Sequence, residues 1–180
     1  MVPALFLDRD GVIVENRPNY IRSWADVFIF PQALEALVKV RIAPYKIVIA
    51  TNQSAVGRGL ISFSEAEAIN QRLVTEIEAA GGRIDAVLMC PHAPEDNCSC
   101  RKPLPGLLFQ AAELLSIDLK NSILIGDALS DIIAGQAAGI QKNALVRTGR
   151  GSIQANLANA ISIEPFLMYD TLAQALADLI

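Results

Sequence analysis

Short apolar runs alternate with longer segments of helical spacing along most of this chain. Each run has the length and the β-branched content of a buried strand, and the five runs lie at Ala4–Leu7, Lys46–Ala50, Ala86–Met89, Ser122–Ile125 and Ala144–Val146. Between and after them, apolar positions recur every three or four residues, at Pro31–Val40, Ser64–Ala79, Pro105–Leu115, Asp131–Ala138 and Leu172–Leu179. Strands that alternate with helices predict an α/β fold, a doubly wound three-layer domain around a central parallel sheet.

Length and charge limit the partners of such a domain. The 180 residues suit a single domain over residues 1–180, and the net charge of −4 with a pI near 5.0 offers no electrostatic footprint for nucleic acid. No apolar run approaches the roughly 20 residues that cross a bilayer, and the first residues lack the basic region of a signal peptide. We therefore expect a cytoplasmic monomer that acts on a small molecule and binds neither nucleic acid nor membrane.

Polar side chains follow four of the predicted strands, at the point where each strand ends. Asp8 and Asp10 follow the first run, Thr51 and Asn52 the second, the cysteines and the histidine the third, and Asp127 the fourth. Ligands of open α/β sheets bind beyond the carboxyl ends of the strands. We expect these four loops to converge on one site.

The first of these loops carries two carboxylates two residues apart. Asp8 and Asp10 would repel each other, and a hard cation such as Mg²⁺, with Asp127 as a further oxygen ligand, would remove that repulsion. Asp8 could then attack phosphorus, and Asp10 could protonate the departing alkoxide and later take a proton from water. An Asp-x-Asp-Gly sequence after a strand is equally well explained, taken alone, by an ordinary Asx turn.

Three other residues complete this hypothesis, and each also has a plainer explanation. Thr51 could donate its hydroxyl to a phosphate oxygen, or it could cap a helix. Lys102 could neutralise a transferring phosphoryl group, or it could be a solvated surface lysine. Asp131 could orient the ligands of the metal without binding the ion itself, or it could be a helix N-terminal acid. Their order along the chain and their positions at strand ends favour the chemical explanation.

The motifs Leu7-Asp8-Arg9-Asp10-Gly11-Val12, Thr51-Asn52, Arg101-Lys102-Pro103 and Gly126-Asp127 with Asp131 together resemble the haloacid dehalogenase superfamily of phosphatases. The resemblance covers almost the whole chain and implies a Rossmann-like domain. It implies Asp8 as the nucleophile, Asp10 as the general acid and base, Thr51 and Lys102 as phosphate-binding residues, and Asp127 as a magnesium ligand. It also implies that Asp10 offers the metal its backbone carbonyl. No insertion is long enough for a large cap domain.

All three cysteines and the only histidine lie within a loop of eleven residues, from Cys90 to Cys100. Cys90, His92, Cys98 and Cys100 form a Cys₃His set suited to tetrahedral Zn²⁺. A Cys98–Cys100 disulfide or plain buried thiols are the alternatives. Four protein ligands leave no position for water, so we expect a structural zinc that holds the loop carrying Arg101 and Lys102.

Within the superfamily, a zinc loop followed by Cys-Arg-Lys-Pro is similar to two groups, the heptose bisphosphate 7-phosphatases and the histidinol-phosphate phosphatases. The segments Thr51–Gly59, Lys102–Gly106 and Val146–Gly149 favour the heptose group. That resemblance implies that Arg101 holds a second phosphate, and that the sugar pocket is lined by Asn16, Arg17, Asn19, Tyr20, Asn52, Gln53 and Ser54. A non-enzymatic zinc-binding scaffold is a further alternative, which would predict the loss of a catalytic residue.

Overall fold

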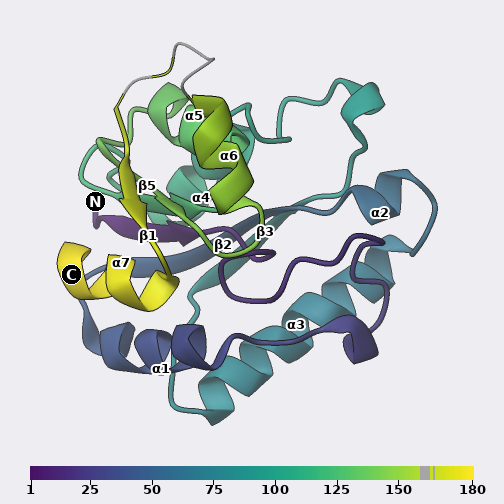
Figure 1. The fold of residues 1–180 in the computed structure, drawn as a ribbon, viewed down its shortest axis with the longest axis horizontal. Coiled ribbons are helices and arrows are strands. Elements are labelled where there is room, and N and C mark those ends of the chain that lie inside the picture. The colour runs from purple at the N-terminus through teal and green to yellow at the C-terminus, as the bar shows by residue number, and fades with distance from the viewer. Residues whose placement is uncertain (159–162, 164) are drawn as a thin grey trace.

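The computed structural model describes residues 1–158, 163 and 165–180. Its centre is a six-stranded sheet in the order β3-β2-β1-β4-β5-β6, in which every neighbouring pair is parallel. The strands are β1 Ala4–Leu7, β2 Lys46–Asn52, β3 Ala86–Cys90, β4 Ile123–Gly126, β5 Lys142–Val146 and β6 Leu167–Tyr169. Helices cover both faces of the sheet (Figure 1). The doubly wound α/β fold expected from the sequence is confirmed.

The five predicted strands and the five predicted helices are all present, with boundaries shifted by no more than two residues. The helices are α1 Pro31–Lys39, α3 Phe63–Ala79, α4 Gly106–Leu115, α5 Leu129–Ala137 and α7 Leu172–Leu179. The edge strand β6 and two further helices, α2 Ser54–Gly57 and α6 Gly151–Ala158, were not predicted from the sequence. Three short 3₁₀ turns, Trp24–Asp26, Val40–Ile42 and Pro94–Asp96, lie in the connections.

Alternate residues of the central strands face opposite layers. Leu5 and Leu7 of β1 pack in the cluster that includes α1, α3 and α7, whereas Ala4 and Phe6 pack in the cluster that includes α4 and α5. Figure 1 shows these two groups of helices below and above the sheet. Because β1 is buried on both faces, its sequence is continuously apolar and does not alternate.

The longest helix, α3, begins at a capping box. The Ser62 hydroxyl accepts a hydrogen bond from the Glu65 backbone N–H at 3.2 Å, and the Glu65 carboxylate accepts one from the Ser62 N–H at 2.7 Å. This reciprocal pair satisfies two N–H groups that the helix leaves without partners. None of the helices within the described residues has the length and apolar character that crossing a membrane requires.

Candidate active site

Asp8, directly after β1, forms a buried ion pair with Lys102 from the loop before α4. The Lys102 Nζ lies 3.1 Å from Asp8 Oδ1 and 2.6 Å from Asp131 Oδ1, and it also donates to the backbone carbonyl of Ala50 at 2.6 Å. Lys102 and Asp8 are only 4% and 7% exposed. The solvated-surface explanation for Lys102 is therefore wrong, because two carboxylates and a backbone carbonyl surround its ammonium.

Burial sets the protonation of this cluster. Burial is the largest cause that raises the pKa of Asp8; the charges of Asp131 and Asp10 add to the rise, the Lys102 ammonium opposes it, and the net pKa is about 6. Burial lowers the pKa of Lys102, but the carboxylates of Asp131 and Asp8 outweigh burial and leave that pKa raised. Lys102 therefore stays charged beside Asp8.

Asp127, directly after β4, is fully buried by the segments that surround it. Its Oδ2 accepts hydrogen bonds from the Arg150 backbone N–H at 2.8 Å and from the Asn16 amide at 3.3 Å, and the Arg150 guanidinium lies 3.2 Å from its Oδ1. Burial and the charge of Asp8 raise the pKa of Asp127, against the effect of Arg150. A Cβ on Gly11 would lie 2.2 Å from Asp127 Oδ2, so only glycine allows this approach.

Asp8, Asp127 and Asp131 bring one carboxylate oxygen each within 4.8 Å of one another. Carboxylate oxygens are the ligands that Mg²⁺ prefers, so the donor set of this cluster fits such an ion. Both oxygens of Asp131 are already engaged, one by Lys102 at 2.6 Å and the other by the Ala128 backbone N–H at 3.0 Å. This geometry suits the positioning role expected for Asp131.

Asp10, two residues after Asp8, is held by a buried arginine. The Arg9 guanidinium lies 2.9 Å from Asp10 Oδ2 and donates to both of its oxygens, and the Gln53 amide donates to Oδ2 at 2.8 Å. The same Gln53 amide donates to the Thr51 hydroxyl at 2.8 Å. Thr51 and Asp10 are thereby connected through one side chain.

A cavity of about 790 Å³ lies over this cluster. Most of the predicted residues line it, namely Asp8, Asp10, Asn16, Arg17, Tyr20, Asn52, Gln53, Ser54, Arg101, Lys102 and Asp131. Thr51 and Asp127 are fully buried beneath the surface of the cavity and do not line it. Asn19 is exposed and also lies outside the lining, with its carbonyl accepting a hydrogen bond from Arg22 at 3.0 Å.

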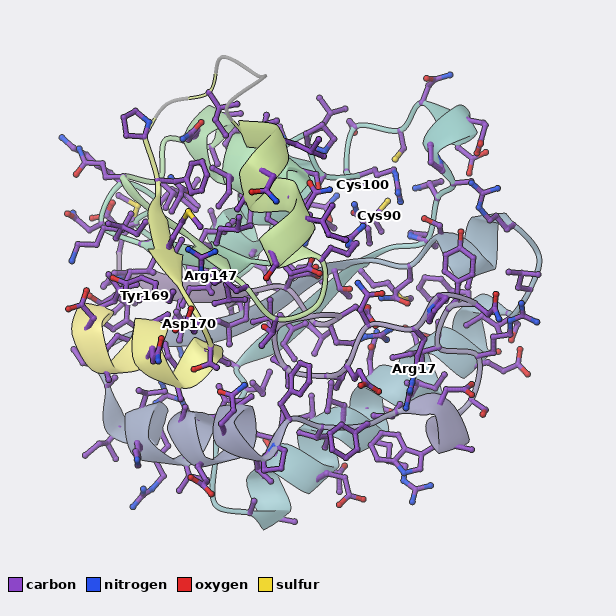
Figure 2. The ribbon with its side chains drawn as sticks, viewed as in Figure 1. Arg17, Cys90, Cys100, Arg147, Tyr169 and Asp170 are labelled. Carbon is purple, nitrogen blue, oxygen red and sulfur yellow. The ribbon has the colours of Figure 1, made fainter. Side chains whose placement is uncertain are left out.

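The predicted zinc residues lie together after β3. The sulfur atoms of Cys90, Cys98 and Cys100 are 3.3 to 3.6 Å apart, and the His92 Nδ1 lies 3.5 Å from Cys90 and 3.4 Å from Cys100. A tetrahedral site with zinc–sulfur bonds of about 2.3 Å places its sulfurs about 3.8 Å apart, so the set fits zinc after a small expansion. All three cysteines are free thiols, which excludes a Cys98–Cys100 disulfide in this structure. Figure 2 shows Cys90 and Cys100 close together.

The cysteine loop and the loop after β2 contact each other directly. Arg101 donates from one nitrogen to the Ser54 hydroxyl at 2.7 Å and to the His92 carbonyl at 3.1 Å. Asn52 exchanges two hydrogen bonds with the backbone of Lys102, at 3.0 and 3.1 Å. The Gly57 N–H donates to the Pro91 carbonyl at 2.8 Å, and a Cβ on Gly57 would lie only 2.4 Å from the Ala93 nitrogen.

Three residues of this region escaped the sequence analysis. Arg58 and Arg150 line the cavity, and Arg9 supports it from behind. Arg150 directly follows Val146-Arg147-Thr148-Gly149 and lies four residues after the end of β5, and this position after a strand end was the available signal. For Arg9 the signal was its position between two predicted catalytic aspartates.

Comparison with known proteins identifies relatives of this chain. A model of HAD-hydrolase-like proteins matches residues 99–175. The D-glycero-beta-D-manno-heptose-1,7-bisphosphate 7-phosphatase of Pseudomonas aeruginosa is 37% identical over 147 residues, which make up 82% of each chain. The alpha-anomer 7-phosphatase of Photorhabdus laumondii is 38% identical over 155 residues, covering 82% of this chain and 84% of the relative.

A solved structure agrees with these relatives. The D,D-heptose 1,7-bisphosphate phosphatase of B. bronchiseptica, crystallised in complex with magnesium and phosphate, matches this structure with a TM-score of 0.91 at 34% identity. The match covers 98% of this chain and 97% of that one. The sequence and structure comparisons thus point to the same group of proteins.

Proposed function

This chain belongs to the haloacid dehalogenase superfamily of phosphatases, and we propose that it removes the C7 phosphate of D-glycero-D-manno-heptose 1,7-bisphosphate. The relatives named for this reaction include enzymes of both anomers, so the proposal covers the C1-phosphorylated sugar in either form. A small sugar phosphate suits the cavity of about 790 Å³. A non-enzymatic scaffold is disfavoured because Asp8, Asp10 and Lys102 all line that cavity.

The proposed reaction proceeds in two displacements. An oxygen of Asp8 attacks phosphorus, the bond between phosphorus and the C7 oxygen breaks, and Asp10 gives its proton to the departing alkoxide. A water molecule then attacks the aspartyl phosphate, Asp10 takes the proton of that water, and inorganic phosphate leaves with Asp8 restored. Lys102, 3.1 Å from Asp8, would neutralise charge on the phosphoryl oxygens, with Thr51 as a further hydrogen-bond donor.

We propose Asp8, Asp127 and the backbone carbonyl of Asp10 as ligands of Mg²⁺, with Asp131 as a positioning residue. When bound, the ion would neutralise the carboxylates and the phosphate oxygens. The three carboxylate oxygens within 4.8 Å support this site. We propose structural Zn²⁺ at Cys90, His92, Cys98 and Cys100. A single domain over residues 1–180, a cytoplasmic location and a monomeric state stay predictions.

The observation that carries the choice of a bisphosphate is the free charge of Arg101. Four arginines line the cavity, and three of them pair with carboxylates: Arg17 with Glu15, Arg58 with Glu95, and Arg150 with Asp127. Arg101 has only neutral partners, Ser54 and the His92 carbonyl, among the described residues. Its guanidinium fork is therefore available for a second phosphate, which histidinol phosphate lacks.

The decisive experiment compares kcat/KM for heptose 1,7-bisphosphate, as separate anomers, with kcat/KM for histidinol phosphate. We expect a clear preference for the bisphosphate and release of the C7 phosphate, with no turnover by Asp8→Asn. Arg101→Gln should raise KM for the bisphosphate by about 10- to 100-fold, as expected for losing a charged hydrogen bond, and leave KM for an aryl monophosphate nearly unchanged. A preference for histidinol phosphate would overturn the proposal.

A further inference from the structure

Arg9 is among the most completely buried large side chains of the protein, although it carries a charge. It is 2% exposed, and its guanidinium makes hydrogen bonds to three residues. Its Nε and one terminal nitrogen donate to Asp10 at 3.1 Å, that same terminal nitrogen donates to the Gln53 carbonyl oxygen at 2.8 Å, and the other donates to the Asn70 carbonyl oxygen at 2.8 Å. The planar fork of arginine thereby connects the end of β1 with α3 and with the loop after β2.

Burying a guanidinium is costly unless it is paired and hydrogen-bonded. Arg9 meets this condition through Asp10, Gln53 and Asn70. Asn70 is itself 5% exposed and lies on the buried face of α3, and Gln53 is 5% exposed. A hydrophobic residue would fill the same space without any of these polar partners, so simple packing does not explain the network.

Asp10 lines the cavity and Arg9 does not. Arg9 can therefore influence a bound substrate only through Asp10 or Gln53. The Asp10 carboxylate accepts from Arg9 at both oxygens and from Gln53 at Oδ2, which prevents free rotation about its last bond. A group that must transfer a proton has to lie within hydrogen-bond reach of the leaving oxygen in a fixed orientation.

We propose that Arg9, anchored by Asn70, is a positioning residue that orients the Asp10 carboxylate for proton transfer. The inference rests on the proposed function, because it requires Asp10 to serve the leaving group. Arg9 takes no part in the attack of Asp8 on phosphorus. Its importance therefore depends on the leaving group: departure of an alkoxide needs the proton of Asp10, whereas departure of p-nitrophenolate does not.

The test measures the pre-steady-state burst of p-nitrophenol from p-nitrophenyl phosphate and the turnover of glycerol phosphate, both with saturating Mg²⁺. In Arg9→Lys, turnover of glycerol phosphate should fall by about 10- to 100-fold with KM changed less than about threefold, since general acid–base catalysis contributes about 10²- to 10⁴-fold. The burst rate should stay within about threefold of the wild-type rate. Lysine keeps the charge but cannot span three partners.

Asn70→Ala provides a second variant that leaves both Arg9 and Asp10 in place. It should also slow glycerol phosphate turnover while leaving the p-nitrophenol burst nearly unchanged, but by a smaller factor than Arg9→Lys. This variant keeps the inference testable if Arg9→Lys does not fold. Arg83→Lys serves as the control for an arginine-to-lysine change, because Arg83 contacts Asp85 and the Tyr45 carbonyl and none of these three residues lines the cavity. We expect wild-type kinetics from it.

Combination with Asp10→Asn separates this inference from the proposed function. Asp10→Asn should slow glycerol phosphate turnover while leaving the p-nitrophenol burst nearly unchanged. If it does, and if adding Arg9→Lys slows glycerol phosphate turnover no further, the positioning role and the proposed function are both supported. If Asp10→Asn shows no such pattern, the proposed role of Asp10 fails. A third outcome overturns the positioning role alone. In it, Asp10→Asn slows glycerol phosphate turnover selectively, but the Arg9 and Asn70 variants slow the p-nitrophenol burst as much as glycerol phosphate turnover, or slow neither.

Discussion

The Arg150 guanidinium lies 3.2 Å from the carboxylate of Asp127, the residue that we propose as a magnesium ligand. The backbone N–H of Arg150 holds the same carboxylate at 2.8 Å. Asp127 would otherwise be a buried anion next to Asp8, so the arginine relieves a repulsion that the ion would also relieve. Arg150 and Mg²⁺ are therefore expected to compete for one carboxylate.

Replacing Arg150 by alanine should tighten Mg²⁺ binding. The side chain is about half exposed, at 54%, so solvent weakens its hold and we expect an affinity gain of only about two- to fivefold. Isothermal titration of the substrate-free protein with Mg²⁺ measures this directly. Arg147→Ala is the matched control, since that neighbouring arginine pairs with Asp170 away from the cavity (Figure 2). Equal affinities in all three proteins would contradict the competition.

Mg²⁺ affinity should depend on pH because Asp8 must be ionised to bind the ion. Its pKa is raised from 3.8 to about 6, chiefly by burial, so the metal-free native state holds an extra proton between these values. Below about pH 6, each ion that binds must displace this proton. The Mg²⁺ affinity should therefore decrease as pH falls, approaching a tenfold decrease per pH unit, and it should become independent of pH above about pH 7.

The same shift sets the sign of a stability effect. The native carboxyl retains its proton up to about pH 6 while the unfolded one loses it near 3.8, so the contribution of Asp8 to stability declines as pH rises through that window in the metal-free protein. Mg²⁺ titrations between pH 5 and 8, with Asp8→Asn as the control, test whether Asp8 is the group whose proton makes Mg²⁺ affinity depend on pH. A slope of the same steepness in Asp8→Asn would assign the proton to another group.

Loss of the proposed zinc should loosen both the fold and the substrate site. We expect about one zinc per chain by elemental analysis, and Cys98→Ser should lower Tm by several degrees because metal binding is coupled to folding. It should also raise KM for the bisphosphate, because Arg101, the proposed ligand of the second phosphate, donates a hydrogen bond to the His92 carbonyl at 3.1 Å and would lose that support. Ser99→Ala, between two cysteines, is the control. Full zinc content in Cys98→Ser would exclude this residue as a ligand.

Gly11→Ala should lower the free energy of unfolding by more than a glycine-to-alanine change at a left-handed position usually does. Gly11 has φ of +82° and Gly81 has φ of +93°, so alanine strains both by about 1 kcal/mol. At Gly81 a Cβ meets nothing within 4 Å, whereas at Gly11 it would meet Asp127 Oδ2 at 2.2 Å. Chemical denaturation and Mg²⁺ titration should show a larger stability loss and weaker binding for Gly11→Ala alone. Equal behaviour of the two variants would contradict the close contact.

The sequence predicted the buried part of the fold well and its edge poorly. Strands β1 to β5 carry apolar residues that pack in the core, and this burial produces the pattern from which they were inferred. β6 has only three residues, so its apolar run Leu167–Tyr169 is too short to be recognised as a strand, and Leu167 and Met168 are about 40% exposed. Helix α6 begins at Gly151, so no N-cap residue marks its start in the sequence. Its amphipathic character is weak, so its apolar positions show no clear helical periodicity.

For the candidate site, residue chemistry and strand ends were sufficient to predict that Asp8 and Lys102 converge and that the cysteines and His92 cluster. They could not reveal that Arg150 contacts Asp127, because this contact depends on how the loop after β5 folds over β4. The burial of Arg9 likewise depends on α3, whose Asn70 lies 61 residues away in the chain. Pairings of this kind are set by tertiary packing, and spacing along the sequence does not encode them.

The contact between Gly57 and the cysteine loop limits how this enzyme could be re-engineered. The Gly57 N–H bonds the Pro91 carbonyl, and the backbone at Ala93 leaves no space for a methyl group. Helix α2 and the loop from residue 90 to 100 therefore pack tightly against each other, and each contributes to the cavity lining, through Ser54 and Pro94 respectively. A graft meant to change the accepted sugar has to exchange both segments together, because either one transplanted alone would meet a mismatched surface.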